Sequence, residues 1–107
     1  MPHYLLQGSY SSQAWAKLTK NPEDRTEPVR KVIEGLGGKL VALFLAFGEY
    51  DVVALIEMPD NVSAAAFSIA GAAAGAVKNV KTTPLMTTED GIAAMRKAAE
   101  AGYRPPS

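Results

Sequence analysis

The stretch that decides the fold runs from Lys39 to Asp60 and reads KLVALFLAFGEYDVVALIEMPD. Its two apolar runs, 40–47 and 50–58, are each too short for a typical independent helix, so we expect two strands buried on both faces. Between them, Gly48-Glu49 has the Gly-X form of a two-residue type II′ turn, whose twist suits antiparallel strands. The stretch therefore predicts a β-hairpin.

Pairing Phe47 with Tyr50 gives this hairpin two different faces, because side chains alternate along a strand. One face is apolar throughout and pairs Leu45 with Val52, Leu43 with Ala54 and Val41 with Ile56. The other face pairs Ala46 with Asp51, Phe44 with Val53, Ala42 with Leu55 and Leu40 with Glu57. This second face is apolar at its centre and has a carboxylate near each end.

The flanking sequence supplies the other elements through its periodicity, capping residues and turn residues. Before the hairpin, we expect a strand over 3–10 and a helical segment from Ser11-Ser12. A second helix is expected to start at Asn21-Pro22, to bend near 26–28 at Pro28 and to end at Gly37-Gly38. After the hairpin, we expect a small-residue helix over 62–74 with a cap at 59–61, an edge strand over 77–86, and a terminal helix from 87 to 101 with an apolar stripe of Ile92, Met95 and Ala99.

This order predicts an α+β fold, a ferredoxin-like βαββαβ unit with a C-terminal helix. We expect strand order 4-1-3-2, with the first and third strands adjacent and parallel, and with the helices covering one face of the sheet. The chain is expected to form a single domain over 1–102, followed by a flexible C-terminal tail over 103–107.

The second sheet face is left without a layer of its own in this arrangement. Its apolar residues Leu5, Phe44, Val53 and Leu55 would each gain about 1.5–3 kcal/mol on burial, on the order of 10 kcal/mol per chain. An apolar patch of this kind normally marks an interaction surface, and the simplest cover is a second copy of the chain. We therefore expect a homo-oligomer, most simply a dimer packed sheet against sheet.

The composition excludes several functional classes. Eleven Lys and Arg balance eleven Asp and Glu, so no basic field favours nucleic acid or anionic lipid. The absence of cysteine excludes thiolate catalysis and Cys-ligated metals, and a single histidine provides no metal signature. Neither a secretory signal nor a membrane span is visible, so we expect a cytoplasmic protein that needs no cofactor or metal.

Two groups of residues are candidates for a site. If the first and third strands are parallel, His3 and Asp51 lie at adjacent strand ends on one sheet face. The Asp51 carboxylate could there orient the His3 imidazole as a general base. Tyr50 would point to the helix side of the sheet and donate a hydrogen bond to a ligand. The alternative is that Asp51 caps backbone N–H groups beside the turn and His3 is simply solvated. Tyr10, Trp15 and Phe67 could line an apolar ligand pocket, or could belong to the core.

Gly48-Glu49-Tyr50-Asp51, with Gly37-Gly38-Lys39-Leu40 before it and Pro59-Asp60 after it, resembles the GYD family of small bacterial proteins. The resemblance extends from about Tyr4 to Met95 and includes the stretch around Asn79-Val80-Lys81. It implies a dimeric ferredoxin-like α+β fold, similar to cofactor-free monooxygenases and isomerases, with no established activity for the family itself.

Two functions follow as hypotheses. The first is a homo-oligomeric module that binds a small apolar or aromatic ligand, or a protein partner, without catalysis. The alternative is a cofactor-independent enzyme of the α+β-barrel type, a monooxygenase or an isomerase, that uses His3, Tyr50 and Asp51.

Overall fold

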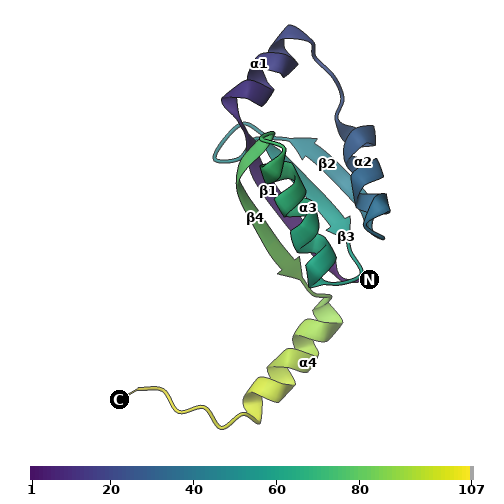
Figure 1. The fold of residues 1–107 in the computed structure, drawn as a ribbon. Coiled ribbons are helices and arrows are strands. Elements are labelled where there is room, and N and C mark those ends of the chain that lie inside the picture. Colours follow the sequence, from purple (N-terminus) through teal and green to yellow (C-terminus); the bar gives the residue numbers. More distant parts are fainter. Residues whose placement is uncertain (107) are drawn as a thin grey trace.

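The computed structural model describes residues 1–106 of the chain as an antiparallel sheet with helices on one side (Figure 1). The elements in chain order are β1 (His3–Tyr10), α1 (Ser12–Lys20), α2 (Thr26–Gly35), β2 (Lys39–Leu45), β3 (Val52–Glu57), α3 (Asn61–Ala73), β4 (Val77–Leu85) and α4 (Thr88–Ala99). The predicted α+β class and ferredoxin-like element order are confirmed.

The strands lie in the order β2-β3-β1-β4, which is the predicted 4-1-3-2 order. The predicted parallel pairing of the first and third strands is wrong, because β1 and β3 are antiparallel and His3 lies opposite Glu57. The helical crossover returns the chain so that β2 runs in the direction of β1, and the hairpin then reverses β3. β3 lies between β1 and β2 and is antiparallel to both.

The hairpin has the predicted register near its turn, where Leu45 pairs with Val52 and Phe44 with Val53. A bulge at Val41 then shifts the pairing by one residue, so that Leu40 lies opposite Ile56 and is buried in the core rather than on the second face. The two-residue turn is also wrong. The last cross-strand bond joins the Ala46 N–H to the Asp51 carbonyl at 2.7 Å, so a longer loop connects the strands.

The first helix begins as the sequence predicts, since the Ser11 hydroxyl accepts a hydrogen bond from the Ala14 N–H at 3.1 Å. The second does not begin at Asn21-Pro22, because Asn21 ends α1. Instead, the Asp24 carboxylate accepts from the Thr26 N–H at 2.9 Å and fixes the start of α2. Pro28 then falls in the first turn, where a missing N–H breaks no helical bond, so the expected bend is not needed.

The C-terminal end of α2 has the geometry that Gly37-Gly38 predicts. Gly37 has a φ of +86°, and the N–H groups of Gly37 and Gly38 donate to the carbonyls of Glu34 and Ile33, each at 2.9 Å. The chain then enters β2 directly. This sharp ending places the buried Ile33 against the sheet.

The hydrophobic core lies between the sheet and the helices α2 and α3, which cover the same face (Figure 1). At its centre, Ile33 from α2 and Ile56 and Met58 from the β3 segment are fully buried. The helix α3 carries mostly small side chains and begins at Asp60, whose carboxylate accepts from the Ser63 N–H at 2.8 Å. Its N-terminal end is tied to β1 by a 2.6 Å hydrogen bond from the Tyr4 hydroxyl to the Asn61 side chain.

The opposite sheet face is not covered by any described element of the chain. Phe44 is 66% exposed there, while Leu5, Val53 and Leu55 are half-buried because neighbouring side chains on the sheet shield one another. These four residues are called the bare face below.

The helix α4 extends away from the sheet and does not join the helical layer (Figure 1). It contains no buried residue, and the predicted stripe residues Ile92 and Met95 are 48% and 70% exposed. The expectation that the helices cover one face therefore holds for α2 and α3, but not for α4 or for α1, which also contains no buried residue and lies beyond the end of the sheet. Residues 103–106 of the predicted tail have no regular secondary structure, and Ser107 lies outside the described residues.

Candidate functional site

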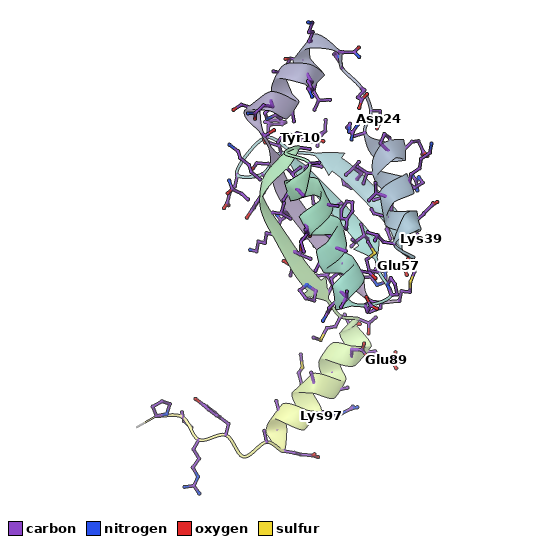
Figure 2. The ribbon with its side chains drawn as sticks, viewed as in Figure 1. Tyr10, Asp24, Lys39, Glu57, Glu89 and Lys97 are labelled. Atoms are coloured by element: carbon purple, nitrogen blue, oxygen red, sulfur yellow. The ribbon has the colours of Figure 1, made fainter. Side chains whose placement is uncertain are left out.

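His3 and Asp51 lie at opposite ends of β1 and do not form a pair. His3 Nε2 is 3.9 Å from Glu57 Oε1, and Glu57 and Tyr10 mark the two ends of the sheet in Figure 2. Asp51 lies beside Tyr10, whose N–H donates to Asp51 Oδ2 at 3.0 Å. The predicted pairing of His3 with Asp51 is therefore wrong. It depended on parallel first and third strands, and the antiparallel register places the two residues at opposite ends of β1.

Asp51 has the structural role that the sequence offers as the alternative. Its carboxylate accepts from the Tyr10 N–H, and its own N–H donates to the Gly8 carbonyl at 2.9 Å. The loop between β2 and β3 is thus bonded to the end of β1. Tyr50 is half-buried and lines a shallow hollow with Gln7 and Val53, which belong to the face away from the helices. The expectation that it points to the helix side is wrong.

A cavity of about 260 Å³ lies between the sheet and the helices α2 and α3. Its apolar lining comes from β1, α2, the β2–β3 hairpin, α3 and β4, and includes Leu6, Val29, Val32, Leu43, Val52, Ala54, Phe67 and Val80. The small residues of α3 keep this space open; Gly71 is one of them, and a Cβ there would lie 2.9 Å from Val77. This is the concave, mostly apolar kind of surface that small ligands occupy.

Tyr10 and Phe67, two of the three aromatic residues predicted to line a pocket, both line this cavity. The third, Trp15, packs edge-on against Tyr10 with ring centroids 5.1 Å apart and lines a neighbouring hollow near α1. Burial raises the pKa of the Tyr10 phenol above its ordinary value; the positive charge of Arg25 opposes this rise, and the carboxylates of Asp51 and Glu23 add to it. Tyr10 is therefore a protonated hydrogen-bond donor at neutral pH.

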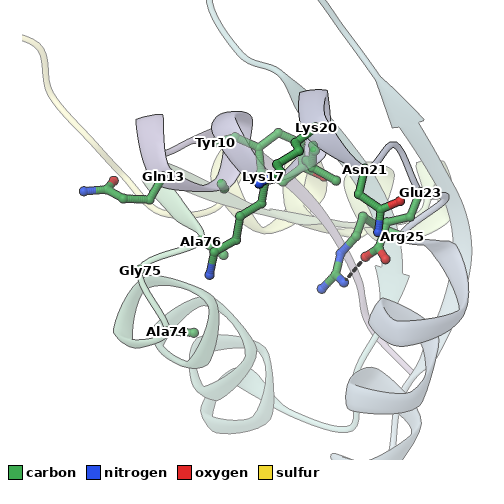
Figure 3. Close-up of a pocket in the computed structure, with 12 residues that line it drawn as sticks. Tyr10, Gln13, Lys17, Lys20, Asn21, Glu23, Arg25, Ala74, Gly75 and Ala76 are labelled. Atoms are coloured by element: carbon green, nitrogen blue, oxygen red, sulfur yellow. Dashed lines mark hydrogen bonds and ion pairs between the residues drawn. The ribbon is translucent and has the colours of Figure 1, made fainter.

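A cleft of about 700 Å³, whose lining includes several charged side chains, adjoins the cavity at the end of the sheet where β1 leads into α1. Tyr10 and Arg25 line both spaces. Figure 3 shows the side chains of Lys17 and Arg25 extending from α1 and from the segment before α2, with Arg25 bonded to Glu23. Because Asp24 bonds to Thr26 and so fixes the start of α2, the backbone of Arg25 has a defined position at the junction of the two spaces.

Within residues 1–106, no three His, Asp or Glu side chains come close enough together to hold a metal ion. In the same part of the chain, no helix is both long enough and apolar enough to cross a membrane.

The sequence interpretation missed the cationic residues of the cleft, Lys17, Lys20 and Arg25. The signal that could have found Arg25 is Asp24-Arg25-Thr26, in which Asp24 accepts a hydrogen bond from the Thr26 N–H just before the helix, and Pro28 fits the first turn. Placing the helix start at Asn21-Pro22 instead hid Arg25 within a presumed helix.

The model of the GYD domain family matches residues 4–95 of the chain. Among solved structures, the chain is similar to TTHA0845 from Thermus thermophilus, with a TM-score of 0.52 and 16% identity over 81% of this chain and 95% of that one. At this identity the likeness bears on the fold alone. A search of the curated proteins finds no match. Since the family model covers most of the sequence, the chain belongs to the GYD domain family.

Proposed function

We propose that this protein is a homo-oligomeric module that binds a small, largely apolar ligand in the cavity between the sheet and the helices α2 and α3. The observation that carries the proposal is the cavity itself, about 260 Å³ in volume, with an apolar lining and the polar groups of Tyr10 and Arg25 at one end. A few polar groups in an apolar pocket commonly fix the orientation of a bound ligand.

Homo-oligomerisation is proposed because the bare face has no cover within the described chain. Phe44 alone is 66% exposed, and burying an apolar side chain of this kind contributes roughly 1.5–3 kcal/mol. The occupant we propose is a second copy, because the same chain also presents α4, a projecting helix with exposed Ile92 and Met95. A helix that buries nothing on its own domain gains apolar contact when it packs on a partner.

Binding is proposed rather than turnover. The enzyme alternative depended on a dyad of His3 and Asp51, and these residues lie at opposite ends of β1. The Asp51 carboxylate also accepts a hydrogen bond from the N–H of Tyr10.

Filling the cavity tests the binding proposal. Val32 lines the cavity and is 45% exposed, so Val32→Phe adds volume at its rim without overpacking the centre of the core. The matched control is Val62→Phe, since Val62 is 78% exposed on α3 and does not line the cavity. Binding of a panel of small apolar and aromatic compounds is measured by native mass spectrometry and confirmed by titration calorimetry.

We expect compounds that bind the wild type and the Val62→Phe control to bind Val32→Phe at least about tenfold more weakly. Equal binding to all three proteins would place the ligand elsewhere and overturn the cavity assignment. Sedimentation velocity at micromolar concentration tests the oligomer separately, and a stable monomer there would overturn it.

A further inference from the structure

The cavity and the cleft adjoin and differ in the side chains that line them. The cavity lining is mostly apolar, and the cleft lining includes several charged side chains. Arg25 is the only charged residue among those that line the cavity, and it stands at the end where the cleft begins. A ligand that fills the cavity and extends into the cleft would therefore pass Arg25 and Tyr10, which line both spaces.

The cleft carries an excess of positive charge. Its charged lining consists of three cations, Lys17, Lys20 and Arg25, and one carboxylate, Glu23. Glu23 pairs with Arg25, and neither lysine forms an ion pair with another residue in the described part of the chain. The excess is local, because positive and negative residues balance over the whole chain.

The backbone carbonyls at the end of α3, which also border the cleft, already have donors. The Gly75 carbonyl accepts from the Ser11 hydroxyl at 2.6 Å, and the Ala76 carbonyl accepts from the Ser11 N–H at 3.0 Å. These carbonyls therefore offer little to a cationic ligand group. The hydroxyl of Tyr10 makes no hydrogen bond to another described residue, so it can donate to an acceptor on a ligand.

We propose that the ligand is an amphipathic anion, with an apolar chain or ring in the cavity and a carboxylate or similar anionic group at Arg25, Lys17 and Lys20. This inference rests on the proposed ligand-binding function and specifies its ligand class. A cavity of about 260 Å³ lies just below the range of roughly 300–1,000 Å³ typical of small-ligand pockets. The apolar part is thus a medium-length chain or one substituted ring.

The test compares three unbranched ten-carbon probes that differ in headgroup: decanoate, decanol and decylamine. Affinities are measured by titration calorimetry at low salt with the full chain. Decanoate is expected to bind at least about tenfold more tightly than decanol, and decylamine most weakly. Raising the salt concentration should weaken decanoate binding and leave decanol unchanged, because salt screens only the charged interaction.

Two variants remove the cations, and one control makes an equal change of charge elsewhere. Lys17→Gln/Lys20→Gln is expected to weaken decanoate binding by about three- to tenfold while leaving decanol binding unchanged, since these lysines line the cleft and not the cavity. Arg25→Gln, which changes the cavity lining itself, is expected to weaken decanoate binding more than decanol binding. The control is Arg96→Gln/Lys97→Gln on α4, which projects away from the cleft (Figure 2). Circular dichroism checks that each variant is folded.

Equal affinity for decanoate and decanol in the wild type would overturn the anionic class while the proposed cavity stands. The anionic class would likewise be overturned if the α4 control weakened decanoate binding as much as the cleft variants do. If neither decanoate nor decanol binds, ligand binding in this cavity fails as well, and the two proposals fall together.

Discussion

The N–H of Tyr10 donates to Asp51 Oδ2 at 3.0 Å, and this one bond joins the aspartate of the Gly-Glu-Tyr-Asp loop to the residue that lines both the cavity and the cleft. The Gly-Glu-Tyr-Asp loop is thus connected to the candidate site by a hydrogen bond to the backbone of β1. Its aspartate holds the end of that strand in place and does not face the cavity.

Replacing Asp51 by alanine should lower the free energy of unfolding by about 1–2 kcal/mol, because the half-buried N–H of Tyr10 loses its acceptor. Urea denaturation measures the loss. Glu49→Ala in the same loop is the control and should stay within about 0.5 kcal/mol of wild type, since its side chain is exposed. An equal loss in both variants would mean that the loop as a whole, and not this bond, is responsible.

Gly38→Ala should destabilise the fold by at least about 2 kcal/mol. A Cβ at Gly38 would lie 2.5 Å from the Glu57 carbonyl oxygen and would also overlap the Met58 sulfur. Gly35→Ala is the matched control, because a Cβ there meets nothing within 4 Å, and alanine in a helix should add roughly 0.5–1 kcal/mol. Thermal and urea unfolding of the two variants should therefore change in opposite directions; a shift of the same sign would refute the close approach at Gly38.

Asp60 predicts a specific acid dependence. The hydrogen bonds from Ser63 lower the pKa of the Asp60 carboxyl below its usual value of 3.8. A carboxyl with a lowered pKa in the folded state stabilises the fold above its unfolded pKa, and this contribution is lost as the pH falls through the folded pKa. The stability difference between wild type and Asp60→Ala should therefore be larger at about pH 7 than at about pH 2.

The measurement for Asp60 is urea denaturation of both proteins across this pH range. Asp60→Asn serves as the comparison, because its amide oxygen can still accept from the Ser63 N–H but carries no charge that depends on pH. A difference at Asp60 that is constant with pH would contradict the assignment of its cap to the charged carboxylate.

A charge on the bare face should separate the copies of the chain. Val53→Asp and the less buried Phe44→Asp are each expected to shift sedimentation from oligomer to monomer at micromolar concentration, because an unpaired carboxylate in an apolar interface carries a large desolvation cost. Val62→Asp on the outer side of α3 is the control and should leave the sedimentation coefficient unchanged. An unchanged oligomer in both folded bare-face variants would rule out this face as the contact.

The register of the hairpin near its turn could be derived from the sequence, because pairing outward from the turn at Gly48-Glu49 places Phe44 opposite Val53. The bulge at Val41 could not, since every residue from 40 to 47 is apolar and a shift by one position leaves the pattern unchanged. The cavity aromatics Tyr10 and Phe67 could be found by residue type. Arg25 was missed, because its position depends on the hydrogen bond from the Thr26 N–H to Asp24, and the sequence also offered a helix start at Asn21-Pro22.

The placement of α4 has a similar cause. Its stripe of Ile92, Met95 and Ala99 predicts that one side of the helix is buried, but periodicity carries no information about which surface covers that side. The structure leaves the stripe exposed.

Both edges of the sheet carry an irregularity, the bulge at Val41 in β2 and a second one in β4, where Asn79 has a φ of +53° opposite the end of β1. A bulged edge offers an interrupted row of N–H and C=O groups, and such edges resist the addition of a further strand. Irregular edges of this kind disfavour the growth of one chain's sheet onto another's. The proposed oligomer would then form through a face, where contact can close on itself after a fixed number of copies, and would be self-limiting.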